Sequence, residues 1–413
     1  MATTPEMFGP YVVYEQLGIG GMASVHVAES RTGRGARKRL ALKRLHAHAA
    51  ADPSLVEAFV EEARLDARLD HPNITKTFEF GEVDGVQYIA MELVIGPTLS
   101  QLLRQCHAAV GHVPVPIVLH ILVDVCEALD YAHTLADEHG QPLHIVHRDV
   151  APTNIIIARD GVVKLIDFGV AKAATSLVKT QTGFVKGKVA YLPPEYLTTG
   201  KLDARADLWS LGVVAYELLA CDRLFDGAND FETLQQIRGA AIEPLARRNT
   251  DVSRSLEAIV MTALERDPAH RWQSAAAMRN ALRGEIAERG AHITNGQVMS
   301  WVEWAFSQKP ANDERSGVSE LIAMLDKPEH ATITLDPDPD TSVGRPTVTL
   351  NRRLEEPKLP TAPARRGVRW WLVALLLAVI AAVVVYELEL KQTVRGAVRT
   401  PATSATSNRI SIG

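Results

Sequence analysis

Hydrophobic and polar positions divide the chain into a part rich in predicted strands and a later part rich in predicted helices. Residues 11–17 alternate as a half-buried strand does, and short apolar runs follow at 40–43 and 86–94. Residues 54–69, between those two runs, have helical spacing. Helical spacing then prevails over the following region, most clearly at 117–133. The pattern predicts a small sheet with one helix, followed by a larger helical region.

One predicted hairpin interrupts the helical region. Its apolar runs are 155–157 and 162–166, and the turn between them is Arg-Asp-Gly at 159–161. Directly before the hairpin stands His-Arg-Asp-Val-Ala-Pro-Thr-Asn, residues 147–154, and directly after it Asp-Phe-Gly, residues 167–169. Because the two strands of a hairpin pair with each other, the two polar segments at their outer ends come together.

Three oxygen-bearing side chains, those of Asp149, Asn154 and Asp167, belong to these segments. A hard cation such as Mg²⁺ prefers oxygen ligands, and a carboxylate can accept the proton of an attacking hydroxyl. The segments resemble the catalytic loop and the metal-binding tripeptide of the eukaryotic-type protein kinases. The resemblance implies that Asp149 accepts the proton of the substrate and that Asn154 and Asp167 hold Mg²⁺, with ATP as the phosphoryl donor.

A glycine-rich turn, Gly-Ile-Gly-Gly-Met-Ala at residues 18–23, follows the first predicted strand. Its glycines let the backbone approach a phosphate closely, although an ordinary hairpin is the simpler interpretation of this turn alone. The kinase pattern has a third glycine where Ala23 stands. Met91 would form the back of the adenine pocket, but a plain core strand at 86–94 fits equally well. By resemblance, the nucleotide-binding residues are Leu17, Gly18, Ile19, Gly20, Gly21, Met22, Ala23, Ser24, Val25, Ala41, Lys43, Met91, Glu92 and Val94.

A lysine, Lys43, ends the second apolar run. Taken alone, it is an ordinary solvated residue at a strand end, but the resemblance makes it the lysine that binds the α- and β-phosphates and is held by a glutamate on the next helix. Glu62 is the expected partner, because it stands nine residues before the His-Pro pair at 71–72. Asp66 replaces an apolar or small residue of the family. Because an unpaired buried carboxylate costs several kcal/mol, we expect this helix to lie outward.

Two positions near Asp149 depart from the pattern of the serine/threonine kinases. Those kinases generally carry a lysine two residues after the catalytic aspartate, where this chain has Ala151, and a threonine where it has Lys188. We expect the ammonium group of Lys188 to supply, from the opposite side, the charge that Ala151 lacks. The alternative is that the two changes together signal a loss of activity. The candidate catalytic residues are then Lys43, Glu62, Asp149, Asn154, Asp167 and Lys188.

The resemblance continues beyond the tripeptide at 167–169. Thr180 and Thr182 are the expected phosphorylation sites of an activation segment, and Arg148 is the expected receptor of the phosphate. Two further contacts are implied: Asp207 with the backbone of the catalytic loop, and Glu195 with Arg271.

Composition excludes some partners. The net charge of −5 gives no support to a nucleic-acid partner. The three cysteines, Cys106, Cys126 and Cys221, are isolated in the sequence and lack the spacing of metal ligands, so we expect buried thiols. The first ten residues lack an apolar run after a basic start, so no secretory signal peptide is expected.

The end of the chain differs in character from the rest. Residues 298–306 predict one more amphipathic helix, and residues 311–369 have the polar, proline-rich composition of a linker. Residues 370–386 are 17 uncharged residues with tryptophan and tyrosine at the ends, which predicts a membrane span. Because ATP is cytosolic, residues 1–369 are expected in the cytoplasm of a bacterial cell, anchored at its inner membrane. Residues 387–413 are too few for a folded sensor outside.

The whole layout indicates an α+β protein with the two-lobed protein kinase fold, most like the bacterial serine/threonine kinases. The resemblance implies transfer of the γ-phosphoryl group of Mg-ATP to serine or threonine of protein substrates, and it allows a kinase-domain dimer that phosphorylates its own activation segment. Two alternatives are a pseudokinase that signals by conformation and a small-molecule phosphotransferase, which the long activation segment disfavours. The expected regions are 11–95 (first lobe) and 96–285 (second lobe) of the kinase domain, 286–310 (helical extension), 311–369 (linker), 370–386 (membrane span) and 387–413 (tail).

Overall fold

The computed structural model describes residues 5–31, 37–168, 188–198, 200 and 202–309. The chain divides into two units, Met1–His330 and Ala331–Gly413, and every described residue lies in the first. The predicted membrane span, linker and tail, together with Thr180 and Thr182, lie outside the described residues. Among the helices that are described, none combines the length and the apolar character needed to cross a membrane.

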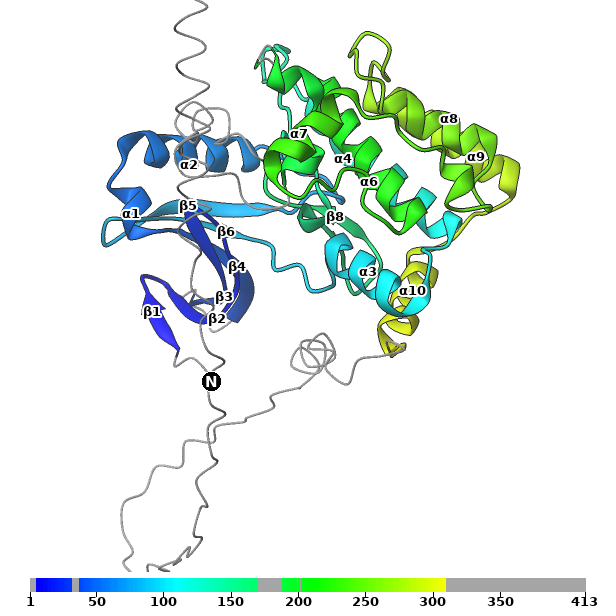
Figure 1. Cartoon of the computed structure of the whole chain (residues 1–413). Coiled ribbons are helices and arrows are strands. Elements are labelled where there is room, and N and C mark those ends of the chain that lie inside the picture. Colours follow the sequence, from blue (N-terminus) through cyan, green and yellow to red (C-terminus); the bar gives the residue numbers. More distant parts are fainter. Residues whose placement is uncertain (1–4, 32–36, 169–187, 199, 201, 310–413) are drawn as a thin grey trace, which may run out of the picture. The chain divides into compact units, whose positions relative to one another are not determined.

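The first lobe is built on an antiparallel sheet. In the described part of the chain it has six strands in the order β1-β2-β3-β4-β6-β5 (Figure 1). The strands at 11–17, 40–43 and 86–94 are confirmed as β2, β4 and β6, although β6 ends at Met91 and the residues after it leave the sheet. The bounds are β1 Glu6–Phe8, β2 Tyr11–Ile19, β3 Ala23–Arg31, β4 Arg37–Leu45, β5 Thr77–Val83 and β6 Val86–Met91.

Two helices, α1 (Ala47–Ala50) and α2 (Pro53–Asp66), pack against this sheet. The start of α2 is set by Asp52, whose carboxylate accepts the N–H of Ser54 at 2.9 Å, with a proline at the first helical position. Phe59 of α2 is buried with residues of β3, β4 and β6. This apolar contact fixes the face of α2 that looks toward the sheet.

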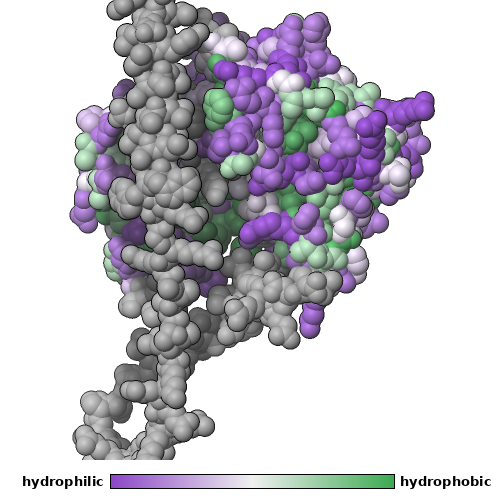
Figure 2. Space-filling view, in the orientation of Figure 1, coloured by the Kyte–Doolittle hydropathy of each residue, from purple (hydrophilic) through white to green (hydrophobic). Residues whose placement is uncertain are grey.

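The second lobe is helical and surrounds α6, which is buried along almost its whole length. Trp209 of α6 is fully buried, and such an all-round apolar helix belongs in the centre of a core. On the face in Figure 2, hydrophilic residues cover most of this lobe, with smaller hydrophobic patches between them. The helices are α3 Leu99–Gln105, α4 Val115–Thr134, α6 Ala204–Ala220, α7 Asp230–Gly239, α8 Arg254–Ala263, α9 Ala275–Arg289 and α10 Asn295–Ser307, with a π-helix at Cys106–Val110 and short 3₁₀ turns at Pro152–Asn154, Val189–Tyr191, Pro194–Leu197 and Leu245–Arg247.

The predicted helix at 298–306 is confirmed as α10, which packs on the second lobe. Gln105 donates hydrogen bonds to the carbonyl oxygens of Ala305 at 2.8 Å and Gln308 at 2.9 Å. At the other end of α10, a Cβ added to Gly161 would lie 1.9 Å from the carbonyl oxygen of Asn295. Gly161 also has a φ of +79°, so only glycine fits the turn that packs there.

All three cysteines are buried, as predicted. Two of them are nevertheless neighbours in space: the side chains of Cys106 and Cys221 share a hydrogen bond, which raises the pKa of the Cys106 thiol. Burial raises the pKa of Cys126. A raised pKa keeps the thiols of Cys106 and Cys126 protonated and unreactive at neutral pH, whereas the same hydrogen bond lowers the pKa of Cys221.

Candidate active site

The predicted hairpin forms the base of the site. Its strands are β7 (Ile155–Ile157) and β8 (Val163–Leu165), which pair antiparallel. Beyond the strands, the N–H of Ile166 donates to the carbonyl oxygen of Asn154 at 3.0 Å. The backbone that carries Asn154 therefore runs beside the backbone that leads into Asp167. Asp167 has a φ of +57°, a left-handed conformation that costs energy in a residue with a side chain and that is common at functional sites.

Asp149, Asn154 and Lys188 meet next to the hairpin. Asn154 Nδ2 donates to Asp149 Oδ2 at 2.7 Å and to the carbonyl oxygen of Asp149 at 2.9 Å. Lys188 Nζ lies 2.7 Å from Asp149 Oδ2 and 3.5 Å from Asn154 Oδ1. The proximity of Lys188 to Asp149 that we expected from the sequence is therefore present. Ala151 is buried, and its methyl group brings no charge to this position.

Lys43 lies between two carboxylates. Its Nζ is 2.6 Å from Glu62 Oε1 and 2.9 Å from Asp167 Oδ1, which confirms the expected contact with Glu62. Burial alone would lower the pKa of Lys43, but the negative charges of Asp167 and Glu62 raise it above its ordinary value. A protonated ammonium group thus links the helix α2 to Asp167.

Asp66 corrects one expectation, since α2 does not lie outward. Glu62 of the same helix already contacts Lys43, and Asp66 Oδ1 is buried with no hydrogen-bond partner among the described residues. Burial and the nearby negative charge of Glu62 raise the pKa of Asp66 well above its ordinary value. A neutral carboxyl is far cheaper to bury than a carboxylate. Protonation of Asp66 therefore lets α2 keep its inward position.

The raised pKa of Asp66 predicts a pH-dependent stability. The folded protein holds a proton on Asp66 that the unfolded chain releases above pH about 4, so this contribution is full below that pH and is lost as the pH rises toward the folded pKa. We expect the wild type to lose unfolding free energy relative to Asp66→Asn, by up to about 1.4 kcal/mol per pH unit. Urea unfolding of both proteins across a pH series measures this difference, and a difference that is constant with pH would contradict it.

Asp207 accepts hydrogen bonds from the backbone of the loop at residues 147–154, as expected. Its Oδ1 accepts the backbone N–H of Arg148 at 2.8 Å, and its Oδ2 accepts the backbone N–H of His147 at 2.8 Å. His133 Nε2 adds a contact of 2.8 Å to the same carboxylate. Burial would raise the pKa of Asp207, but the hydrogen bond from His133 and the backbone N–H of His147 hold it below its ordinary value. The loop backbone is thereby tied to α6 at the core of the lobe.

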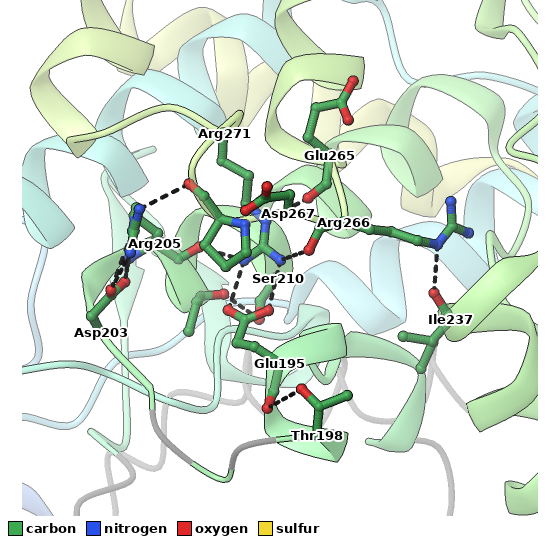
Figure 3. Close-up of polar contacts among 12 residues, drawn as sticks. Glu195, Thr198, Asp203, Arg205, Ser210, Ile237, Glu265, Arg266, Asp267 and Arg271 are labelled. Carbon is green, nitrogen blue, oxygen red and sulfur yellow. Dashed lines mark hydrogen bonds and ion pairs between the residues drawn. The ribbon is translucent and has the colours of Figure 1, made fainter. Parts of the chain in front are cut away.

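The expected pair of Glu195 and Arg271 is also present (Figure 3). The two terminal nitrogens of the guanidinium group, Nη1 and Nη2, donate to the two carboxylate oxygens at 2.7 Å and 2.6 Å, which is the bidentate geometry that favours arginine over lysine. The side chain of Arg271 is 0% exposed. The pair fixes the segment that follows Lys188 against the helical lobe.

Four of the nucleotide-binding candidates lie on one face of the sheet. Val25 stands opposite Lys43, and Ala41 stands opposite Met91. Directly opposed residues share a face, as do residues two apart on one strand, so all four point the same way. After β6, the N–H of Glu92 donates to the carbonyl oxygen of Lys76 at 2.8 Å. The other candidates are Leu17, Gly18 and Ile19 at the end of β2, Gly20, Gly21 and Met22 in the turn, Ala23 and Ser24 at the start of β3, and Val94 after β6.

Two residues beside this turn were not predicted from the sequence. His46 and His48 follow β4, and their rings contact the carbonyl oxygens of Gly20 and Gly21. Neither histidine belongs to a motif that we recognised, and the only available signal was their place just after the strand that carries Lys43.

The fold and the site together define a protein kinase. Residues 11–282 match the family model described as protein kinase domain, which is more than half of the chain. The chain therefore belongs to the protein kinase family, and the two-lobed fold predicted from the sequence is confirmed.

Kinases of bacteria are among its relatives. The chain is 39% identical over 292 residues to the tyrosine-protein kinase MasK of Myxococcus xanthus, covering 71% of this chain and 45% of the relative. It is 37% identical over 285 residues to the serine/threonine-protein kinase PknB of Mycobacterium leprae, covering 68% and 43%. The chain thus spans less than half the length of these curated relatives. The crystal structure of the PknI kinase domain of Mycobacterium tuberculosis is similar with a TM-score of 0.52 and 29% identity, over 68% of this chain and 99% of that one.

Proposed function

We propose that this protein transfers the γ-phosphoryl group of ATP to serine and threonine hydroxyls of proteins. The observation that carries the proposal is the joining of two clusters by the hairpin β7–β8. One cluster holds Lys43 between Glu62 and Asp167, and the other holds Asp149 next to Asn154 and Lys188. Phosphoryl transfer is catalysed mainly by positioning and by neutralising charge, and these side chains supply both.

Each group has a role in this proposal. Asp149 orients the acceptor hydroxyl and takes its proton. Asn154 turns its amide nitrogen toward Asp149, so its Oδ1, which now accepts from Thr153 at 3.3 Å and from Lys188 at 3.5 Å, is the atom that would bind a cation. The carboxylate of Asp167 would supply the second oxygen ligand. This donor set suits Mg²⁺, which when bound neutralises the phosphate charge. Lys43 binds the α- and β-phosphates.

The adenine base is assigned to the face of the sheet that carries Val25, Ala41 and Met91. The carbonyl oxygen of Glu92 and the backbone of Val94 would bind the purine edge. The assignment to the carbonyl of Glu92 follows from its N–H, which already donates to Lys76.

Membrane attachment and self-regulation complete the proposal. Residues 370–386 would anchor the protein in the inner membrane with the kinase domain in the cytoplasm, because their uncharged run has the length and the aromatic ends of a span. Phosphorylation of Thr180 or Thr182, in cis or within a kinase-domain dimer, would order the activation segment through Arg148. Arg148 suits this role, since its Nε is buried without a hydrogen-bond partner among the described residues.

The test is phosphoryl transfer by the purified full-length protein with Mg-ATP, followed by mapping of the phosphorylated residues. We expect phosphoserine and phosphothreonine, with loss of all incorporation when EDTA removes the metal. Asp149→Asn, purified in parallel, controls for contaminating kinases. If phosphotyrosine alone is found, the acceptor is tyrosine, as the name of MasK states for that relative, and the proposed serine and threonine acceptors are wrong. Nucleotide binding without any transfer would favour the pseudokinase, and transfer only to small molecules the third alternative.

A further inference from the structure

Two histidine rings rest against the glycine-rich turn between β2 and β3. His46 Nε2 lies 3.2 Å from the carbonyl oxygen of Gly20, and His48 Nε2 lies 3.1 Å from that of Gly21. The rings stack on each other, with centroids 5.3 Å apart and planes at 24°. A carbonyl oxygen can only accept, so the imidazole N–H is the donor in both contacts. The backbone N–H of His46 also donates to the carbonyl oxygen of Met22 at 2.8 Å.

These contacts set the direction of the peptide groups in the turn. A trans peptide is planar, and its C=O and the following N–H point to opposite sides. A ring that holds the carbonyl of Gly20 on one side therefore turns the N–H of Gly21 to the other, and the ring on Gly21 does the same for the N–H of Met22. Donation to the carbonyl also polarises each peptide and strengthens its N–H as a donor.

The histidines are also held by a helix outside the turn. His46 directly precedes α1 and His48 is its second residue, and Ala49 of that helix is fully buried with Phe59 of α2 in the core beside the sheet. The glycines, in contrast, have no side chain with which to fix their own conformation. Because α1 is packed in the core, the hydrogen bonds from the two rings restrict the glycine-rich turn, which would otherwise sample several conformations.

We propose that His46 and His48 are positioning residues that aim the N–H groups of Gly21 and Met22 at the phosphates of the bound nucleotide. The inference rests on the proposed function, and it takes the phosphates of bound ATP to lie at the glycine-rich turn, where glycines let the backbone approach them closely. It implies that the two rings contribute to the binding of the triphosphate and not to that of the adenosine part, whose proposed contacts lie on β3, β4 and β6 and in the segment after β6.

Calorimetric titration of the full-length protein tests this. The probes are adenosine and a non-hydrolysable ATP analogue with Mg²⁺. His46→Phe/His48→Phe keeps two stacked aromatic rings and removes both donors, and His46→Gln/His48→Gln keeps a donor at a similar reach. We expect the phenylalanine variant to bind the analogue about tenfold more weakly and adenosine within about twofold of the wild type, since two hydrogen bonds are lost. The glutamine variant should regain most of the affinity for the analogue.

Three outcomes would overturn the inference: unchanged affinity of the phenylalanine variant for the analogue, an equal loss for adenosine, or a glutamine variant as weak as the phenylalanine one. His139→Phe is the matched control, because His139 is an exposed histidine of the second lobe, and it should leave both affinities unchanged. Failure of the wild type to bind the analogue would instead refute the proposed function itself, and with it this role of the histidines.

Discussion

Replacing Lys188 by threonine is expected to lower kcat by about a hundredfold or more while KM for ATP changes little. The ammonium group lies 2.7 Å from Asp149 Oδ2 and 3.5 Å from Asn154 Oδ1, where the transferred group and the acceptor hydroxyl would meet. A charge at that place stabilises the transition state more than bound ATP, so its loss appears in kcat. Steady-state kinetics of phosphoryl transfer by the full-length variant measure both constants.

The charge can also be moved back to the position usual in serine/threonine kinases. Lys188→Thr combined with Ala151→Lys restores that arrangement, and we expect it to recover at least about tenfold of the lost kcat, because one cation again faces the reacting groups. Lys309→Thr removes an exposed lysine and serves as the control with an unchanged rate. If the single variant Lys188→Thr keeps the wild-type kcat, the ammonium group of Lys188 does not contribute to catalysis.

The sequence was sufficient to predict the elements whose apolar pattern extends over enough residues to be recognised and the contacts that follow from spacing in the sequence. The strands β2, β4 and β6, the helices α2, α4 and α10, and the hairpin β7–β8 all follow from apolar spacing. The contact of Lys43 with Glu62 was predictable because family spacing fixes which glutamate faces the strand. The strand β1 was missed, since three residues are too short to show alternation.

Other features depend on contacts between segments that are distant in the sequence. The expected outward position of α2 was wrong because pattern analysis treats Asp66 as charged, whereas its pKa in the folded protein is set by burial and by neighbours from other elements. The contact between Cys106 and Cys221 and the contacts of His46 and His48 with the turn are of the same kind. No local pattern encodes them, because they arise only when the elements pack.

Removing the guanidinium of Arg271 is expected to cost about 3–5 kcal/mol of unfolding free energy, among the largest effects of any single change in the chain. Arg271 donates to both oxygens of Glu195, and its remaining donors reach the carbonyl oxygens of Glu265 at 2.6 Å and Arg266 at 2.9 Å (Figure 3). Arg271→Leu removes both hydrogen bonds and the charge that the guanidinium offers this carboxylate, which is only 14% exposed. Thermal unfolding should show a fall in Tm of about 10 °C.

Three further variants separate the lost ion pair from the general effect of removing an arginine. Arg248→Leu is the matched control, because Arg248 also contacts two carboxylates but is 46% exposed, and its Tm should stay close to that of the wild type. Arg271→Lys keeps the charge without the two-pronged geometry and should lie between the wild type and Arg271→Leu. The double variant Glu195→Leu/Arg271→Leu should be more stable than Arg271→Leu alone, because no unpaired buried charge remains. If Arg271→Leu is as mild as Arg248→Leu, the buried pair does not hold this segment, and the placement of Lys188 next to Asp149 must then depend on other contacts.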